Sequence, residues 1–431
     1  MGAGSRIAVT AAGAVTTIVL ARLLGPAGWG TYFVAQSLFL LLTLLAGLGV
    51  EHGIAYYVGA RKWGARAAYR AALKVAILAG CAAAALGLGA RAIAPSAFAG
   101  LSMWLTAAVV VALPFGLVRF YVSYVALAID RYEAYTLMSA LQALLALVFA
   151  VPAAVLFGVG GAIVATTLAT VAVGVTAALW AERRFPPSHA AEPGQLGRAI
   201  SFGIKGYAAN ALQLLNYRLD VFILSAVAST AAVGRYSLAV AMTALIWLLP
   251  DALSEVLFPR VARLGRREDE VAREMVETKS LRHASLLVAT ATVLLAAALM
   301  LLVVPVFGEE FRRAVTLGLI LLPGAALVGV SSVLAAIIVG RGKPIYTLYG
   351  ALVVTPLTVL LYALLIPWRQ AEGAAIASTL SYLGSFLLAL WFYRRITRRP
   401  VLPLLVPTRS ELHDLLAVPG AIRARLAGAR R

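Results

Sequence analysis

Charged side chains occur inside stretches of this chain that are otherwise apolar enough to cross a membrane. Arg119, Lys205 and Arg218 lie within such stretches. A charged group at the centre of a bilayer costs roughly 2.5–3.5 kcal/mol on insertion scales, so it usually faces a partner or a water-filled cavity. Cationic groups that line a cavity can hold an anion, and the guanidinium group matches the oxygens of a phosphate especially well.

Other polar residues surround Arg218 in the sequence. If this part of the chain forms one continuous helix, Lys205, Asn216 and Asp220 fall within about 60° of one another, and Gln213 lies at the edge of that arc. Arg218 would then point well away from Asp220, so at most one of the two sets faces a cavity squarely. Asn216 and Gln213 are predicted to line that cavity.

Carboxylates form a complementary set. Asp251 and Glu255 are four residues apart, which places them on one face of a helix. Glu51 precedes Glu255 by 204 residues, so a carboxylate recurs in the two halves of the chain. Together with Asp220 they are candidates for binding a proton or Na⁺ during a transport cycle. A second interpretation stays open for every one of these charges, namely that they pair between helices and hold the bundle together.

Motifs for other chemistry are missing from the sequence. There is no P-loop, which argues against intrinsic ATP hydrolysis. The four histidines are scattered without metal-ligand spacing, and the single cysteine, Cys81, allows no intrachain disulfide. We therefore expect no cofactor and no metal. The predicted external loops are too short to hold a transferase site, so we expect the chain not to be an enzyme.

The elements that position these charges are predicted to be transmembrane helices. The chain is 62% hydrophobic and 13% charged, with a mean hydropathy of +0.91, which one aqueous core cannot bury. Barrel-like alternation is absent, so helices must satisfy the backbone in lipid. We predict an all-α polytopic protein with about twelve spans: 7–24, 31–57, 70–92, 102–128, 134–157, 161–181, 198–226, 232–258, 282–305, 314–339, 345–366 and 372–393.

The basic residues fix the predicted orientation. The formal charge of +19 could suggest a nucleic-acid partner, but the Lys and Arg residues follow the loops of a membrane topology. Of the 37, we assign 28 to one side and six to the other, and this asymmetry predicts that both termini are cytoplasmic. We therefore expect no nucleic-acid partner.

Two charged segments lie on the predicted cytoplasmic side. Residues 259–283 are expected to form a solvated helical connection. In the tail, Ser410 could cap a short helix that carries Leu412, Leu415 and Leu416. This tail is interpreted as a membrane-surface helix attracted to anionic lipid, with a disordered basic tail as the alternative.

The chain also contains an internal repeat. Val19–Ala35 aligns with Ile223–Ala239 at an offset of 204, and Gly160–Leu168 aligns with Glu372–Leu380 at an offset of 212. Six spans per repeat is an even number, so the two halves share one orientation. We predict two six-helix lobes, residues 1–190 and 191–397, followed by a basic cytoplasmic tail, residues 398–431.

Two segments resemble a known family. They are LARLLGPAGWGTYFVAQSL near the N-terminus and LNYRLDVFILSAVASTAAVGRYSLAVAMTALIWLLPDALSEVLFPRVARL in the middle. Both resemble the bacterial polysaccharide flippases of the O-antigen and capsule type, in the superfamily that includes the multidrug and toxin extrusion (MATE) transporters. The resemblance covers most of residues 7–395. It implies a V-shaped, MATE-like bundle of two lobes around a basic cavity, in the inner membrane of a bacterium.

The resemblance also implies a substrate. This would be a polyprenyl-diphosphate-linked oligosaccharide, moved to the outer leaflet by alternating access for surface polysaccharide such as the O-antigen of lipopolysaccharide. Arg218 matches the basic position of NYRLD, and Arg22 matches that of LARLLGP. Arg119 and Lys205 are predicted to be diphosphate ligands only because they lie within the predicted spans. H⁺ or Na⁺, and other polysaccharide-assembly proteins, are expected partners.

Three alternatives remain at this point. A MATE-type cation-coupled multidrug antiporter would have the same fold. A membrane polysaccharide polymerase or ligase would be an enzyme, and a structural scaffold would have no transport activity. The lipid II flippases of the same superfamily typically have fourteen spans, which argues against that closer identity.

Overall fold

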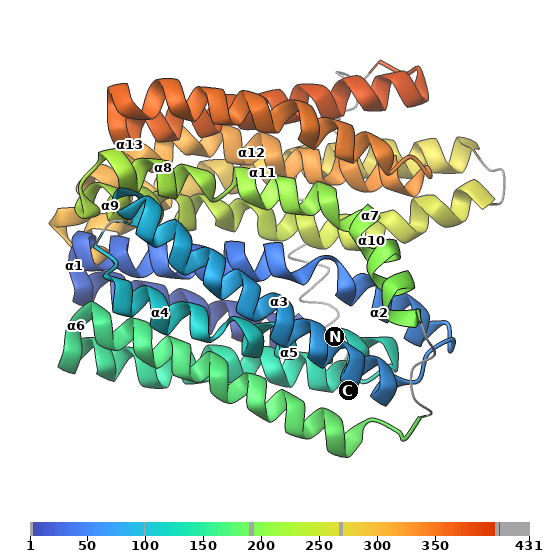
Figure 1. Cartoon of the computed structure of the whole chain (residues 1–431). Coiled ribbons are helices and arrows are strands. Elements are labelled where there is room, and N and C mark those ends of the chain that lie inside the picture. The colour runs from blue at the N-terminus through green and yellow to red at the C-terminus, as the bar shows by residue number, and fades with distance from the viewer. Residues whose placement is uncertain (1–2, 99, 189–193, 267–269, 401–404, 406–431) are drawn as a thin grey trace, which may run out of the picture. The chain divides into compact units, whose positions relative to one another are not determined.

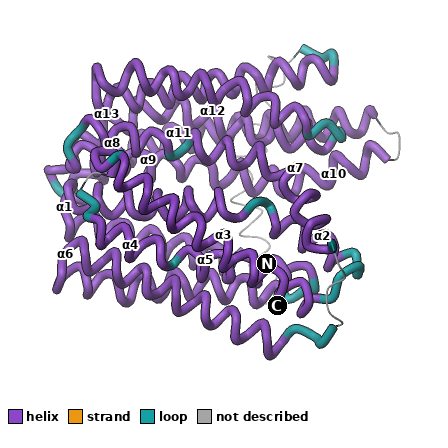
Figure 2. Tube along the Cα trace, viewed as in Figure 1, coloured by secondary structure: helices purple, strands orange, loops and turns teal. Residues whose placement is uncertain are grey.

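The chain is helical throughout the part that its structure describes. The structure is a computed structural model and describes residues 3–98, 100–188, 194–266, 270–400 and 405. Within these residues there is no strand, and short turns join the helices (Figure 2). In lipid, this arrangement satisfies the backbone N–H and C=O groups inside each helix. The predicted all-α class is confirmed.

Thirteen α-helices follow one another in the described residues (Figure 1). The first six are α1 (Ala3–Gly47), α2 (Val50–Gly59), α3 (Ala65–Ile93), α4 (Met103–Val111), α5 (Leu113–Ala128) and α6 (Tyr132–Arg184). The others are α7 (Gln195–Asn216), α8 (Leu219–Val227), α9 (Thr230–Thr243), α10 (Leu248–Arg266), α11 (Glu270–Phe307), α12 (Arg312–Gly340) and α13 (Ile345–Thr397). Short 3₁₀ turns lie at Pro95–Phe98, Ala244–Trp247 and Glu309–Phe311.

Three of the long helices are broken inside. Non-helical backbone interrupts α1 at Gly25, α6 at Gly158 and α13 at Gln370, all with positive φ. The Gln142 side chain of α6 donates a 3.2 Å hydrogen bond to Thr170 of the same helix, so the two legs of α6 lie side by side. Figure 1 shows the same reversal in α13. Glycine suits such a corner because it has no Cβ to strain the left-handed backbone.

These reversals explain the number of spans. In the described residues, eight helical segments are long and apolar enough to cross a membrane. Counting the legs of α1, α6 and α13 separately, and adding α7 with α8, accounts for the twelve predicted spans. The prediction of a polytopic bundle of about twelve helices is therefore confirmed.

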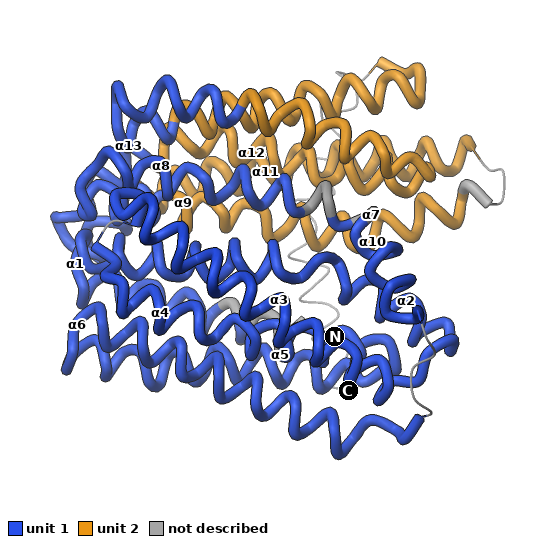
Figure 3. Tube along the Cα trace, in the orientation of Figure 1, with its two compact units in different colours: residues 1–239, 302–317, 358–375 blue, residues 240–301, 318–357, 376–431 orange. Residues whose placement is uncertain are grey.

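The helices form two compact units, each of which is described by itself (Figure 3). Unit 1 comprises residues 1–239, 302–317 and 358–375, and unit 2 comprises residues 240–301, 318–357 and 376–431. The predicted lobes, 1–190 and 191–397, stay a prediction. The predicted tail helix at Ser410 lies outside the described residues.

A close helix crossing in unit 1 joins the two copies of the repeat. A Cβ added to Gly30 of α1 would lie 2.3 Å from the carbonyl oxygen of Thr230 and 2.8 Å from the nitrogen of Gly234 in α9. A Cβ on Gly234 would lie 1.8 Å from the carbonyl oxygen of Pro26. Small residues let two backbones approach this closely in membrane helices. Gly30 and Gly234 are equivalent positions of the repeat, so each meets its own counterpart.

A second close crossing in unit 1 joins α2 to α7. A Cβ on Gly53 would lie 2.0 Å from the carbonyl oxygen of Ala199, and one on Gly203 would lie 1.8 Å from that of Gly49. Gly49 also precedes α2 with φ 71°, a backbone conformation that favours glycine. The break between α1 and α2 therefore sits against α7, and it positions the carboxylate of Glu51 described below.

Unit 2 contains a buried ionic cluster at the start of α11. The Glu277 side chain is fully buried and accepts hydrogen bonds from Arg341 Nε at 2.7 Å, Arg341 Nη2 at 2.9 Å and the Tyr393 hydroxyl at 3.1 Å. Arg341 Nη2 also lies 2.8 Å from Glu270. The expectation that residues 259–283 form a solvated connection is wrong at this point, because Arg341 from the α12–α13 turn covers Glu277.

Candidate functional site

The predicted polar stripe around Arg218 does not lie on one helix. α7 ends at Asn216 and α8 begins at Leu219, with a turn between them. The assumption of a continuous helix is therefore wrong, and Asp220 does not share a helical face with Lys205. The backbone of Lys205 belongs to α7, but its side chain lies outside the described part of the structure.

Arg218 and Asp220 have different environments at this turn. The guanidinium carbon of Arg218 lies 5.1 Å from the centre of the Phe33 ring in α1, which is a cation–π distance. Asp220 is 1% exposed and accepts hydrogen bonds from the Tyr236 hydroxyl and, at 2.7 Å, from the backbone N–H of Val221. It also lies in the first turn of α8, where the helix dipole favours a carboxylate. These donors give Asp220 a structural role.

Arg22 is held by a helix end. Its Nη1 donates hydrogen bonds to the carbonyl oxygens of Pro305 at 3.2 Å and Val306 at 2.9 Å, in the last turn of α11. Arg235 of α9 donates similarly to the carbonyl oxygen of Glu310 at 2.7 Å. Basic side chains commonly satisfy the last carbonyls of a helix in this way. Both arginines thus fix residues 302–317 within unit 1, and binding of a diphosphate by Arg22 stays a prediction.

Arg119 lies in α5 and is partly buried. Its Nε has no hydrogen-bond partner, and no carboxylate pairs with it, among the residues that the structure describes. An unsatisfied buried donor is costly, and more so when it is charged. Of the three predicted anion ligands whose side chains the structure describes, Arg119 is the one for which it offers no competing contact.

Glu51 is a buried carboxylate in the first turn of α2. It is 1% exposed, and His52 Nε2 lies 3.8 Å from its Oε1. Its Oε2 has no hydrogen-bond partner among the described residues. Two nearby tyrosines donate elsewhere: Tyr121 to the carbonyl oxygen of Gly47 at 3.1 Å, and Tyr207 to that of Leu44 at 2.7 Å. The tyrosines therefore satisfy the end of α1 and leave the carboxylate with unused acceptor capacity.

The two carboxylates of α10 lie in unit 2. Both Asp251 and Glu255 are exposed. Ser254, between them, donates to the carbonyl oxygen of Pro250 at 2.8 Å. The structure thus keeps Asp251 and Glu255 on one accessible helix face, as predicted from their spacing. Their predicted role in ion coupling stays a prediction.

The two predicted polar lining residues differ in exposure. Asn216 is 6% exposed, and its backbone carbonyl accepts a 3.1 Å hydrogen bond from the Tyr362 hydroxyl of α13. Gln213 is exposed and donates from Nε2 to the Tyr217 hydroxyl at 2.7 Å. Their predicted role in lining a cavity stays a prediction.

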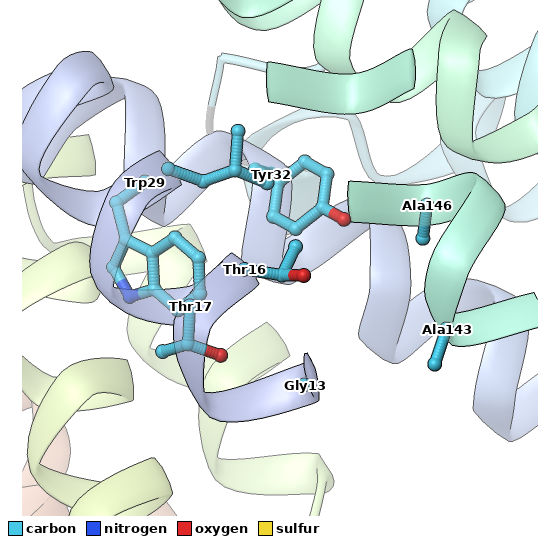
Figure 4. Close-up of a pocket in the computed structure, with 8 residues that line it drawn as sticks. Gly13, Thr16, Thr17, Trp29, Tyr32, Ala143 and Ala146 are labelled. Atoms are coloured by element: carbon cyan, nitrogen blue, oxygen red, sulfur yellow. The ribbon is translucent and has the colours of Figure 1, made fainter. Parts of the chain in front are cut away.

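Unit 1 also contains a pocket that the sequence did not predict. It has a volume of about 190 Å³ and lies between α1 and the first leg of α6 (Figure 4). Its lining residues carry no charge: Gly13, Thr16, Thr17, Leu20, Trp29, Tyr32, Ala143 and Ala146. Threonine and aromatic residues are common in transmembrane helices, so their types alone gave no signal. Elsewhere in the described residues, no group of three or more His, Cys, Asp or Glu side chains could hold a metal ion.

The sequence and the structure were compared with those of known proteins. The sequence matches the model of the family described as polysaccharide biosynthesis protein over residues 19–316. A search of curated proteins finds no match.

Solved structures share the fold at low sequence identity. An inward-facing multidrug resistance transporter of the MATE family is 19% identical, with a TM-score of 0.68 over 90% of this chain and 95% of the other. The lipid II flippase MurJ, in an inward closed conformation, is 10% identical, with a TM-score of 0.72 over 93% of this chain and 89% of the other. A MOP superfamily transporter from Pyrococcus furiosus is 15% identical, with a TM-score of 0.60 over 92% and 94%.

The match to the family model covers more than half of the chain, and the solved structures share its helical arrangement over nine tenths of it. The chain therefore shares the fold of these solved structures, and it belongs to the polysaccharide biosynthesis protein family.

Proposed function

We propose that the protein moves a polyprenyl-diphosphate-linked oligosaccharide from the cytoplasmic to the outer leaflet of the bacterial inner membrane. Transport would proceed by alternating access, with both termini in the cytoplasm. The match to a polysaccharide biosynthesis family supports the class of cargo, and the fold supports a transporter. The direction of transport and the diphosphate group of the cargo are proposed here in addition to the family match and the fold.

The proposal depends most on the unpaired guanidinium group of Arg119 in the described structure. A guanidinium group inside a span, without a carboxylate partner in the described structure, is expensive unless an anion completes it. A diphosphate carries two phosphate groups, and bidentate contacts between arginine and phosphate are among the strong charge-assisted hydrogen bonds. Arg218 and Lys205 would contribute further positive charge to the same anion.

The test is translocation of a fluorescent polyprenyl-diphosphate oligosaccharide in proteoliposomes, with Arg119→Gln. A charged hydrogen bond is worth about 1.5–3 kcal/mol, so we expect transport to slow by roughly ten- to a hundredfold. Because Arg119 has no partner to lose, its replacement is expected to leave thermal stability unchanged or higher. Slow transport by a protein of undiminished stability is the signature of a ligand contact.

Arg312→Gln is a matched control. Arg312 has a 70% exposed side chain, pairs with Glu309 at 2.7 Å and lies outside the predicted spans, so its removal is expected to leave transport unchanged. If Arg119→Gln transports like the wild type, the proposed anion contact is wrong. If it unfolds at a markedly lower temperature instead, Arg119 is a structural residue.

Glu51 favours a second candidate function, a cation-coupled multidrug antiporter. A buried carboxylate with one oxygen that has no partner among the described residues could bind an organic cation or a coupling ion. The two functions differ in cells: an antiporter would raise drug resistance on overexpression and leave surface polysaccharide unchanged. We favour the flippase because the family match concerns polysaccharide biosynthesis.

A further inference from the structure

The uncharged pocket of unit 1 is built from three helical legs. Gly13, Thr16 and Thr17 come from the first leg of α1, Trp29 and Tyr32 follow its Gly25 corner, and Ala143 and Ala146 come from α6. In Figure 4 the Trp29 and Tyr32 side chains lie beside the two threonines, with the alanines across the gap. One wall of the pocket is thus aromatic, one carries hydroxyl groups, and one is formed by the small side chains of the alanines.

A neutral polar network lies behind the pocket. The Tyr32 hydroxyl lies 3.2 Å from the hydroxyl of Thr166, and Gln142 donates to Thr170 at 3.2 Å. Both threonines belong to the second leg of α6. Hydroxyl and amide groups of this kind can both donate and accept, so they suit a guest that does the same.

Trp29 contributes its ring to the pocket rather than its indole N–H group. The residue is 4% exposed and lines the pocket, but its Nε1 is buried and makes no hydrogen bond in the described structure. The hydroxyl groups of Thr16, Thr17 and Tyr32 are therefore the side-chain polar groups that the lining residues offer to a guest.

Size and depth narrow the class of guest. A water molecule takes roughly 30 Å³ of liquid volume, so a cavity of 190 Å³ has room for a group the size of a single sugar ring. Thr17 is eight residues before the corner at Gly25, which at 1.5 Å per residue puts it about 12 Å from the corner along the helix. With the corner at the predicted outer face, the pocket lies within the hydrocarbon region, which is about 30 Å thick.

We propose that this pocket binds an uncharged sugar ring of the cargo as the glycan crosses the membrane. The apolar C–H face of the ring would pack on Trp29 or Tyr32, as apolar groups do on aromatic faces. Its hydroxyl groups would bond to the hydroxyl group of Thr17. The absence of charge on the lining residues makes the pocket a poor site for diphosphate or for an acidic sugar.

This inference rests on the proposed function for its biological cargo, but the site can be tested separately. The first measurement is binding of polyprenyl diphosphate, with and without a neutral oligosaccharide, to full-length protein in detergent. Thr17→Val removes one hydroxyl group. One hydrogen bond is worth a factor of roughly three to ten, so we expect the glycosylated lipid to bind more weakly by that factor. Binding of the sugar-free lipid is expected to stay unchanged.

Thr176→Val is a matched control on α6. Thr176 is exposed, bonds to the carbonyl oxygen of Ala172 in its own helix and lies outside the pocket, so its loss is expected to change neither affinity. If Thr17→Val weakens both lipids equally, the pocket holds the carrier lipid and the proposal is overturned. An unchanged affinity for both lipids overturns it as well.

A second measurement does not need lipid-linked cargo. Cys81 is the only cysteine in the chain, so Ala146→Cys in a Cys81→Ser background gives one thiol at the pocket. We expect a free neutral oligosaccharide to slow maleimide labelling of this thiol at least threefold, and sugar-free polyprenyl diphosphate to leave it unchanged. If labelling is slowed by sugar while translocation fails, the pocket stands and the flippase proposal falls. If the sugar does not slow labelling, the proposed sugar site is wrong.

Discussion

Two buried glutamates in this protein have opposite surroundings. Glu277 in unit 2 accepts three hydrogen bonds, two from Arg341 and one from Tyr393. Glu51 in unit 1 is equally buried, yet its ion-pair contact in the described structure is a long one, 3.8 Å to His52, and its Oε2 has no donor among the described residues. A carboxylate that is fully paired stabilises one arrangement of helices. A carboxylate with unused capacity can exchange a ligand, which is what a transport cycle requires.

The largest effect is expected at Glu277. Glu277→Ala leaves Arg341 buried without its bidentate partner, and breaking a buried pair from one side costs about 3–5 kcal/mol. Thermal unfolding of the purified protein would measure the loss. Replacing both residues, as Glu277→Met with Arg341→Met, is expected to recover most of the stability, because no buried charge is then left alone. A single variant as stable as the wild type would show that the cluster is not structural.

A smaller effect is expected from Tyr393→Phe. The change removes one hydroxyl donor to Glu277 and keeps the aromatic ring, so we expect about 1 kcal/mol of destabilisation. Transport is expected to stay at the wild-type rate. Loss of transport at unchanged stability would place Tyr393 in the working part of the cycle and weaken the contrast with Glu51.

The smallest effect on stability is expected at Glu51, with a large effect on coupling. Glu51→Gln keeps the shape and removes the charge, so the stability should change by less than about 1 kcal/mol because the described ion-pair contact that is lost is a long one, 3.8 Å to His52. If Glu51 binds the coupling ion, the transport rate of the variant no longer depends on an imposed H⁺ or Na⁺ gradient. Asp251→Asn, which also keeps the shape and removes the charge, is the matched comparison at an exposed carboxylate of unit 2. A large drop in unfolding temperature for Glu51→Gln would show that Glu51, like Glu277, has a structural role.

Hydropathy alone predicted the spans well, because apolar length is set by the thickness of the bilayer. The predicted spans also end at residues 24 and 157, directly before the corners at Gly25 and Gly158, where glycine marks the turn. Gln370 is a corner with φ 50° and carries no such signal. The prediction of a polar face around Lys205 and Asp220 was wrong for a related reason. The turn after Asn216 contains neither glycine nor proline, so nothing in the sequence indicated that the helix ends there.

Side-chain partners were harder to predict than helices. Arg22 bonds to backbone carbonyls nearly three hundred positions away, and every residue type offers such an acceptor. Glu277 looked solvated because its neighbours in sequence are charged, whereas its partners Arg341 and Tyr393 come from two other elements. Burial and pairing of this kind depend on tertiary packing, which local pattern does not contain.

The crossing of Gly30 and Gly234 has a consequence for how this chain can change over time. The two glycines occupy equivalent positions of a repeat and lie against one another, and a Cβ on either would overlap backbone atoms of the other helix. A methyl group gained in one copy therefore cannot be absorbed by a loss in the other, because both are already at the minimum size. At this crossing, a side chain gained at either glycine is placed against the backbone of the other copy of the repeat.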